Sequence, residues 1–108
     1  MADSDYVVVF ATCDSLAEAD RIAERLVTEK LAACVNINDR VTSIYEWKGK
    51  IQRDVEAFII IKTKRSLVDQ VQTAVKSESS YDCPEIIALP IVAGSSDYLK
   101  WLGDVTQG

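Results

Sequence analysis

The chain has 108 residues, of which 48% are hydrophobic and 27% are charged. These values are typical of a globular protein and exclude a disordered chain, and the length suits one domain spanning residues 1–108. Twelve Lys and Arg against seventeen Asp and Glu give a net charge of −5. With no basic cluster, this balance argues against nucleic acid and anionic membranes as partners. No apolar run approaches the roughly 20 residues of a membrane span.

The start of the chain and the cysteines favour a cytoplasmic protein. Residues 1–5 lack the basic and apolar regions of a signal peptide. Cys13, Cys34 and Cys83 are odd in number, widely separated and without C-x-x-C spacing, so we expect free thiols in a reducing cytoplasm. Of these, Cys34 is expected to pack in the core and Cys13 to lie in a loop before a helix.

The first two elements are a central strand and an amphipathic helix. Residues 6–12 form a continuous apolar run, which predicts a strand flanked on both edges. A helix follows from Ser15, which forms a capping-box pattern with Glu18. Helical spacing predicts a buried stripe of Leu16, Ala19, Ile22, Ala23, Leu26 and Val27, with Glu18, Asp20, Arg21, Glu24 and Arg25 facing water.

A long β-hairpin occupies residues 31–63. Gly49 is the residue suited to positive φ between two arms rich in β-branched and aromatic residues, which predicts a turn at Lys48 and Gly49. The outgoing arm, residues 33–47, is about three times the usual ~5–6 residues of a strand. Straight, it would span roughly 50 Å, whereas a domain of this size has a radius of gyration of ~13 Å. The arm must bulge or bend, or its tip must leave the domain.

The tip of the hairpin is predicted to contact other subunits. Strand alternation places Val41, Tyr45 and Trp47 on one face of the outgoing arm. An apolar ribbon with free edges is typical of an interaction surface. We therefore expect an oligomerisation arm whose interface includes Val41, Ile44, Tyr45 and Trp47. For Tyr45 and Trp47, stacking against a ligand is the alternative.

The second half of the chain repeats the strand–helix order. A box-like start at residues 66–69 opens a second helix, which ends near residue 77. After a polar segment, residues 85–92 read as a strand in which Pro90 lacks an amide proton, so this strand must lie at an edge or contain a bulge. A turn at residues 94–97 leads to a short helix over 98–102, closed at Gly103.

The element order β-α-β-β-α-β plus a small helix predicts an α+β fold, the ferredoxin-like sandwich. Right-handed crossovers place the first and third strands centrally and both helices on one face. The third strand is apolar on both faces, with Ala57, Ile59 and Ile61 on one and Phe58 and Ile60 on the other. Because no helix remains to cover the second face, another subunit is the natural candidate.

Five segments of the sequence resemble the CutA divalent-cation tolerance family, in register and over nearly the whole chain: residues 31–37, 43–51, 61–63, 84–91 and 97–102. The resemblance implies the ferredoxin-like fold and a tight homotrimer in which the long hairpin extends the sheets between subunits. It also implies a non-enzymatic role in tolerance to copper and other divalent cations, with direct metal binding in some members. The trimer is similar in architecture to PII-type signalling proteins, so a regulatory trimer that binds a small ligand in an intersubunit cleft is the alternative.

The sequence departs from this family at the place where copper would bind. The family pattern His-Pro-Tyr-Glu-x-Pro-Glu reads Ser-Ser-Tyr-Asp-Cys-Pro-Glu at residues 79–85, and the chain contains no histidine. Copper or another divalent cation would therefore need thiolate, carboxylate or carbonyl ligands. Cys83, flanked by Asp82 and Glu85, is the candidate metal site. One thiol per subunit makes a poor site unless subunits pool their ligands.

The intersubunit cleft has its own candidate residues, namely Tyr81, Trp47, Lys50 and Lys62. An ion pair between Lys62 and Glu85 of neighbouring subunits is the alternative for that lysine. Catalysis finds little support, because a chain without histidine has no Ser-His or Cys-His pair and its four glycines are isolated. An enzyme using Lys62, Tyr81 and Glu85 is the third hypothesis.

Overall fold

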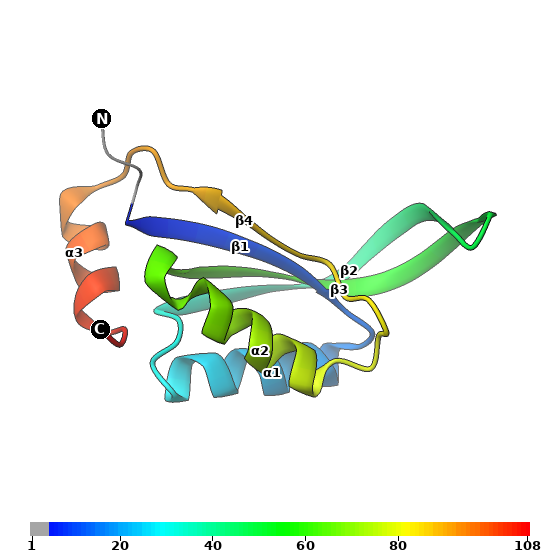
Figure 1. Cartoon of the computed structure of the whole chain (residues 1–108), viewed down its shortest axis with the longest axis horizontal. Helices are drawn as coiled ribbons and strands as arrows, with labels where there is room; N and C mark the ends of the chain where they lie inside the picture. Colours follow the sequence, from blue (N-terminus) through cyan, green and yellow to red (C-terminus); the bar gives the residue numbers. More distant parts are fainter. Residues whose placement is uncertain (1–4) are drawn as a thin grey trace.

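Figure 1 shows the computed structural model, which describes residues 5–108. The elements in chain order are β1 (Tyr6–Cys13), α1 (Leu16–Thr28), β2 (Cys34–Trp47), β3 (Lys50–Lys64), the 3₁₀ turn η1 (Arg65–Leu67), α2 (Val68–Glu78), β4 (Ile86–Pro90) and α3 (Ser96–Asp104). The strands form one antiparallel sheet in the order β2-β3-β1-β4. The predicted α+β, ferredoxin-like fold with two central strands is confirmed.

The short strand β4 lies at the edge of the sheet, as its proline requires. Its one neighbour among the described strands is β1, and Pro90 is paired with Val7. A residue without an amide proton is tolerated there because the outer side of an edge strand has no partner to bond. The strand is shorter than predicted, ending at Pro90 rather than at residue 92.

The core lies between the sheet and the helices α1 and α2, which run side by side under one face (Figure 1). Its largest fully buried side chains include Val9, Ile59 and Ile61 of the strands, Ile22 and Leu26 of α1, and Val71 and Val75 of α2. Each such side chain contributes about 1.5–3 kcal/mol when it leaves water.

The buried stripe of α1 is narrower than predicted. Leu16 and Val27 are 46% and 45% exposed, because they lie at the two ends of the helix and beside the arc that faces the sheet. Glu18, predicted to face water, is instead buried, with 3% of its surface exposed. The cause is a set of contacts with a distant loop, described below.

The arms of the hairpin continue beyond the ends of β1 and β4, so that the tip projects along the long axis of the molecule (Figure 1). The β2–β3 pairing shifts register between Asn38 and Val41. Both alternatives therefore apply, since the strand contains a bulge and its tip also leaves the rest of the sheet. At the turn, Lys48 and Gly49 have φ angles of 52° and 81°, the left-handed pair that a two-residue hairpin requires.

The remaining helix boundaries differ from the sequence prediction in two places. A 3₁₀ turn precedes α2, and no side chain caps that helix, because the turn places Leu67 in the core before the helix begins. The last helix begins after Ser95, whose Oγ accepts from Tyr98 N, and continues through Gly103 to Asp104. Among residues 5–108 no helix has the length and apolar character needed to cross a bilayer.

The second face of the sheet has an apolar centre. Phe10, Phe58 and Ile60 are half-buried there, and the Phe10 and Phe58 rings lie 5.3 Å apart. On β4 the neighbouring Ile87 and Leu89 are exposed. Figure 1 places α3 at the end of the sheet, so within residues 5–108 no helix covers this apolar centre.

We expect Gly49→Ala to destabilise the protein by about 1–2 kcal/mol, because an L-residue at this φ brings its Cβ too close to the following carbonyl. The added methyl group would meet no atom within 4 Å, so the cost is one of backbone conformation alone. Urea denaturation measures it. Lys48→Gly is the matched control, expected to be near neutral because relief of the same strain offsets the greater freedom of glycine when unfolded. Equal midpoints for Gly49→Ala and the wild type would contradict the assigned turn.

Candidate functional site

A cavity of about 650 Å³ lies at the base of the projecting hairpin. Its walls come from the end of β1, from both arms of the hairpin and from the loop between α2 and β4, residues 79–85. This volume falls within the roughly 300–1,000 Å³ of small-molecule sites. The side chains that give it chemical character are the carboxylates Glu56, Asp82 and Glu85, the rings of Tyr45, Trp47 and Tyr81, and the thiol of Cys83.

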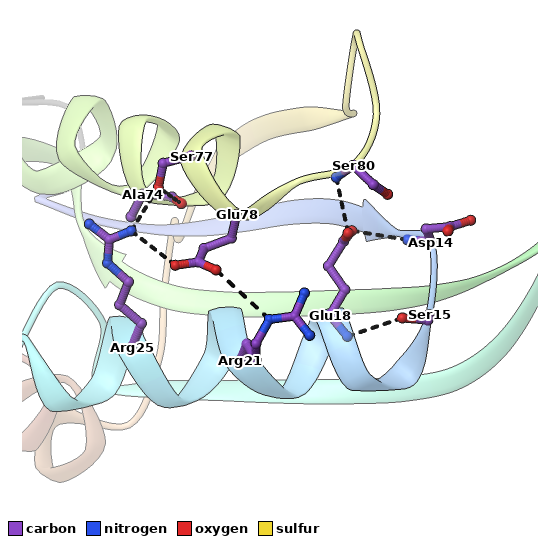
Figure 2. A network of polar contacts seen from close by, with 9 residues as sticks. All are labelled: Asp14, Ser15, Glu18, Arg21, Arg25, Ala74, Ser77, Glu78 and Ser80. Atoms are coloured by element: carbon purple, nitrogen blue, oxygen red, sulfur yellow. Dashed lines mark hydrogen bonds and ion pairs between the residues drawn. The ribbon is translucent and has the colours of Figure 1, made fainter.

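The buried carboxylate of Glu18 holds the loop against α1 (Figure 2). Its Oε1 accepts a hydrogen bond from Ser80 N at 3.0 Å, and its Oε2 accepts from Asp14 N at 3.1 Å. Half of the predicted capping box is present, since Ser15 Oγ accepts from Glu18 N at 3.1 Å. The carboxylate, predicted to complete the box, bonds the loop instead. Loop amides need an acceptor when they leave water, and Glu18 supplies it.

A second set of contacts fixes the end of α2, from which the loop departs (Figure 2). Arg25 Nη1 donates to Ser77 Oγ at 2.7 Å and lies 3.4 Å from Glu78 Oε2. Arg21 Nε is 3.9 Å from Glu78 Oε1. Partly exposed ion pairs contribute at most about 1 kcal/mol each, so their main effect is to set the position of α2 relative to α1.

Tyr81 and Glu56 close the loop onto the sheet. The Tyr81 hydroxyl donates to Glu56 Oε1 at 2.8 Å, and Glu56 is 9% exposed. Burial, the hydrogen bond to Glu56 and the negative charges of Glu56, Asp14 and Glu18 together raise the pKa of Tyr81. The phenol therefore stays protonated and donating. Sequence reasoning missed Glu56, although a signal existed in its position on the same strand face as the apolar Phe58 and Ile60.

The hairpin wall presents two partly exposed rings to the cavity. Tyr45 donates its hydroxyl to Asp54 Oδ2, a hydrogen bond that raises the pKa of the phenol. The Trp47 ring has Lys48 Nζ 5.9 Å from its centroid. Of the other residues predicted for the oligomer interface, Val41 is half-buried and Ile44 is 58% exposed.

The predicted metal ligands share the cavity without forming a metal centre in one chain. Asp82, Cys83 and Glu85 are all exposed and line the same wall. Among residues 5–108, no three His, Cys, Asp or Glu side chains come close enough to hold a metal ion. A metal held at this loop would need ligands from a second copy of the chain.

The residues predicted for a ligand cleft are divided by the structure. Tyr81 and Trp47 line the cavity together, whereas the two lysines do not. Lys50 lies beside the turn, where it is paired with Trp47 along the ladder. Lys62 pairs with Val8 and Cys34, on the part of the sheet away from the hairpin tip.

The three cysteines are free, as predicted, but two of them are placed differently. Cys13 ends β1 and is fully buried rather than in a loop, and Cys34 is half-buried at the start of β2 rather than sealed in the core. Burial, followed by the negative charges of Glu18 and Glu56, raises the pKa of the Cys13 thiol to about 12. Cys83 is the exposed thiol.

Comparison with known proteins identifies the family. The family model described as CutA1 divalent ion tolerance protein matches residues 7–105. "Protein CutA, chloroplastic" from Arabidopsis thaliana is 46% identical over 94% of this chain, and the chain spans 56% of the length of that relative. The crystal structure of CutA1 from Oryza sativa superposes with a TM-score of 0.93 at 44% identity, covering 97% of this chain and 96% of that one. The chain belongs to the CutA divalent-cation tolerance family.

The prediction of a cytoplasmic protein is wrong. The Arabidopsis relative is described as chloroplastic. A structure described as the periplasmic divalent cation tolerance protein CutA from Archaeoglobus fulgidus matches with a TM-score of 0.92 at 39% identity, covering 94% of this chain and 99% of that one. Free thiols therefore do not indicate a compartment here. In this fold Cys13 and Cys34 lie on β1 and β2, which are separated by β3.

We expect Glu18→Ala to destabilise the protein by about 2–4 kcal/mol, because it leaves the amides of Asp14 and Ser80 without their charged acceptor. Urea denaturation measures the change. Glu24→Ala, an exposed position on the same helix, is the matched control and should change stability by no more than about 0.5 kcal/mol. A loss no greater than that of the control would show that the Glu18 hydrogen bonds do not hold the loop.

Alkaline pH should remove a stabilising contribution of the Cys13 thiol. Its pKa is about 12 in the folded chain and 9.0 when unperturbed, so between these values the unfolded state loses a proton that the folded state retains. Stability therefore falls as pH rises above 9, by at most about 1.4 kcal/mol per pH unit from this group. The difference in unfolding free energy between the wild type and Cys13→Ala should shrink between about pH 8 and pH 10.5. A constant difference would contradict the raised pKa.

Proposed function

We propose that this chain acts in divalent-cation tolerance as a non-enzymatic homotrimer built from one domain spanning residues 1–108. The observation that carries the proposal is the projecting hairpin, whose two faces both expose apolar side chains. Ile44, Ile51 and Val55 are 58%, 74% and 50% exposed on one face. Tyr45 and Trp47 stand on the other. Such a surface is costly to leave in water and favours association.

Both sheet edges also favour association. β2 and β4 are the outer strands, and an outer strand carries a row of unpaired N–H and C=O groups. An arm that pairs with the edge of the next copy makes a head-to-tail contact, and three such contacts close a ring. The same ring would cover the apolar centre of the second sheet face. The resemblance to CutA trimers supports three as the number.

In this proposal the divalent cation binds where copies meet. Cys83, Asp82 and Glu85 are exposed on one loop and need further ligands from a neighbouring copy. A thiolate ligand favours Cu(I) or Zn(II) over Mg²⁺ or Ca²⁺. The absence of any histidine from the sequence supports a binding role over nucleophilic catalysis, because no imidazole can act as the base.

A regulatory role with a small ligand is the second candidate, favoured by the cavity itself. Tyr81 and Trp47 meet there, and the loop that carries Tyr81 is held by two buried carboxylates. This version uses the cavity as the ligand site and needs neither Lys50 nor Lys62.

Native mass spectrometry under reducing conditions, with and without added copper or zinc, tests assembly and metal binding together. We expect an assembly of three 12.0-kDa chains that carries whole numbers of metal ions, and the metal should be lost in Cys83→Ser but kept in Cys34→Ser. A monomer would refute the role of the hairpin. A trimer that stays metal-free, or a Cys83→Ser trimer that keeps its metal, would refute the site.

A charge placed on the hairpin should disrupt the trimer without unfolding the chain. Val55→Lys changes a side chain that is 50% exposed in the isolated chain, so it should alter assembly and leave the fold intact. Val27→Lys, on α1 at 45% exposure, is the matched control. Size-exclusion chromatography should show smaller species for Val55→Lys alone. Equal elution of the two variants would count against the hairpin as the interface.

A further inference from the structure

The cavity at the base of the hairpin is negatively charged without compensation from its own walls. Glu56, Asp82 and Glu85 line it, and no lysine or arginine of residues 5–108 does. The negative charge also affects Tyr81, whose pKa is raised by burial, by its hydrogen bond to Glu56 and by the charges of Glu56, Asp14 and Glu18. A charged small molecule bound in this cavity must therefore be a cation.

The arrangement of these groups suits an organic cation better than a bare metal ion. No three ligand side chains among residues 5–108 converge on one point, so the negative charge is spread along the cavity. At ~30 Å³ per water molecule, a volume of about 650 Å³ holds roughly twenty waters, far more than one ion displaces. Three aromatic rings share the walls, and rings attract ammonium groups through their faces while they pack against methylene chains.

Glu56 supplies a specific contact point. It is 9% exposed and lines the cavity, and its Oε1 is occupied by the Tyr81 hydroxyl at 2.8 Å. Among residues 5–108 no buried side-chain oxygen lacks a hydrogen-bond partner, so any acceptor capacity that this carboxylate has left opens onto the cavity that it lines. A carboxylate that is largely removed from water favours any ligand that brings both a hydrogen-bond donor and a positive charge.

The walls are also fixed before a ligand arrives. Tyr81 is held by Glu56, the Ser80 amide is held by Glu18, and Tyr45 is held by Asp54. A site whose side chains are already ordered loses little conformational entropy on binding.

We propose that this cavity binds a linear aliphatic polyamine. One ammonium group donates to Glu56 Oε2, the methylene chain lies against the rings of the hairpin wall, and a second ammonium group reaches the carboxylates of the loop. The inference rests on the second proposed function, the small-ligand site, and names the chemical class of that ligand, whose binding needs neither a thiolate nor a metal ion.

Isothermal titration calorimetry with spermidine as the probe tests this, on the metal-free protein in about 0.15 M salt, where diffuse attraction is largely screened. We expect one saturable site per chain. Glu56→Gln should weaken binding by about tenfold or more, the effect of losing one charge-assisted hydrogen bond. The exposed Glu24→Gln carries the same charge change outside the cavity and should bind spermidine as the wild type does. Glu85→Gln changes an exposed carboxylate of the same cavity and keeps the test decisive if Glu56→Gln does not fold.

Three results would overturn the proposal. They are the absence of saturable binding by the wild type, equal weakening in Glu24→Gln and in the cavity variants, and displacement of spermidine by an equal charge of Mg²⁺. The last two would mean that spermidine only screens the net charge of the chain. Because the protein is metal-free and the readout is heat, these outcomes are independent of trimer mass and metal content.

Discussion

The structure depends on β3, a single strand whose two halves lie in different environments. The second half of β3 is buried against α1 and α2 through Ala57, Ile59 and Ile61, whereas its first half pairs with β2 alone among the described strands. Hydrophobic burial fixes the register of the inner half, and beyond the register shift between Asn38 and Val41 the two arms pair with each other as far as the turn. Glu56 lies at the boundary between the two halves, and the cavity that it lines extends from there along the arm to Trp47 beside the turn.

Two buried carboxylates give this region its chemical character. Glu18 binds the amides of Asp14 and Ser80, and Glu56 binds the Tyr81 hydroxyl. Burial is the main cause of the raised pKa of the Cys13 thiol, and the charges of Glu18 and Glu56 add to it, so that thiol stays neutral, while Cys83 is exposed at the loop. The two carboxylates therefore act on this region both through their hydrogen bonds and through their negative charge.

The sequence predicted what local patterns and strand pairing determine, and missed what distant contacts determine. The turn at Gly49, the edge position forced by Pro90 and the departure of the hairpin all follow from nearby residues. The burial of Glu18 and Glu56 does not, because each carboxylate is satisfied by a residue of the loop, 62 and 25 positions away respectively. Helical spacing placed Glu18 in water, since charged residues are rarely buried unless paired. Lys62 was predicted to line a cleft between subunits because strand ends often form ligand sites; it lies outside the cavity of the single chain, and its place in an intersubunit cleft stays a prediction.

In the loop of residues 79–85, the groups that bond the loop to the rest of the chain differ from the exposed carboxylate and thiol side chains. The Ser80 amide and the Tyr81 hydroxyl bind the buried carboxylates, and Ser79 Oγ accepts from Tyr81 N at 3.1 Å. The histidine-containing pattern that this loop resembles has proline where this chain has Ser80, and proline has no amide proton, so the hydrogen bond from Ser80 N to Glu18 depends on this departure. Asp82 and Cys83 are exposed and line the cavity. The sequence offers no imidazole at this loop, and the cavity beside it is lined instead by the carboxylates of Glu56, Asp82 and Glu85 and the thiol of Cys83.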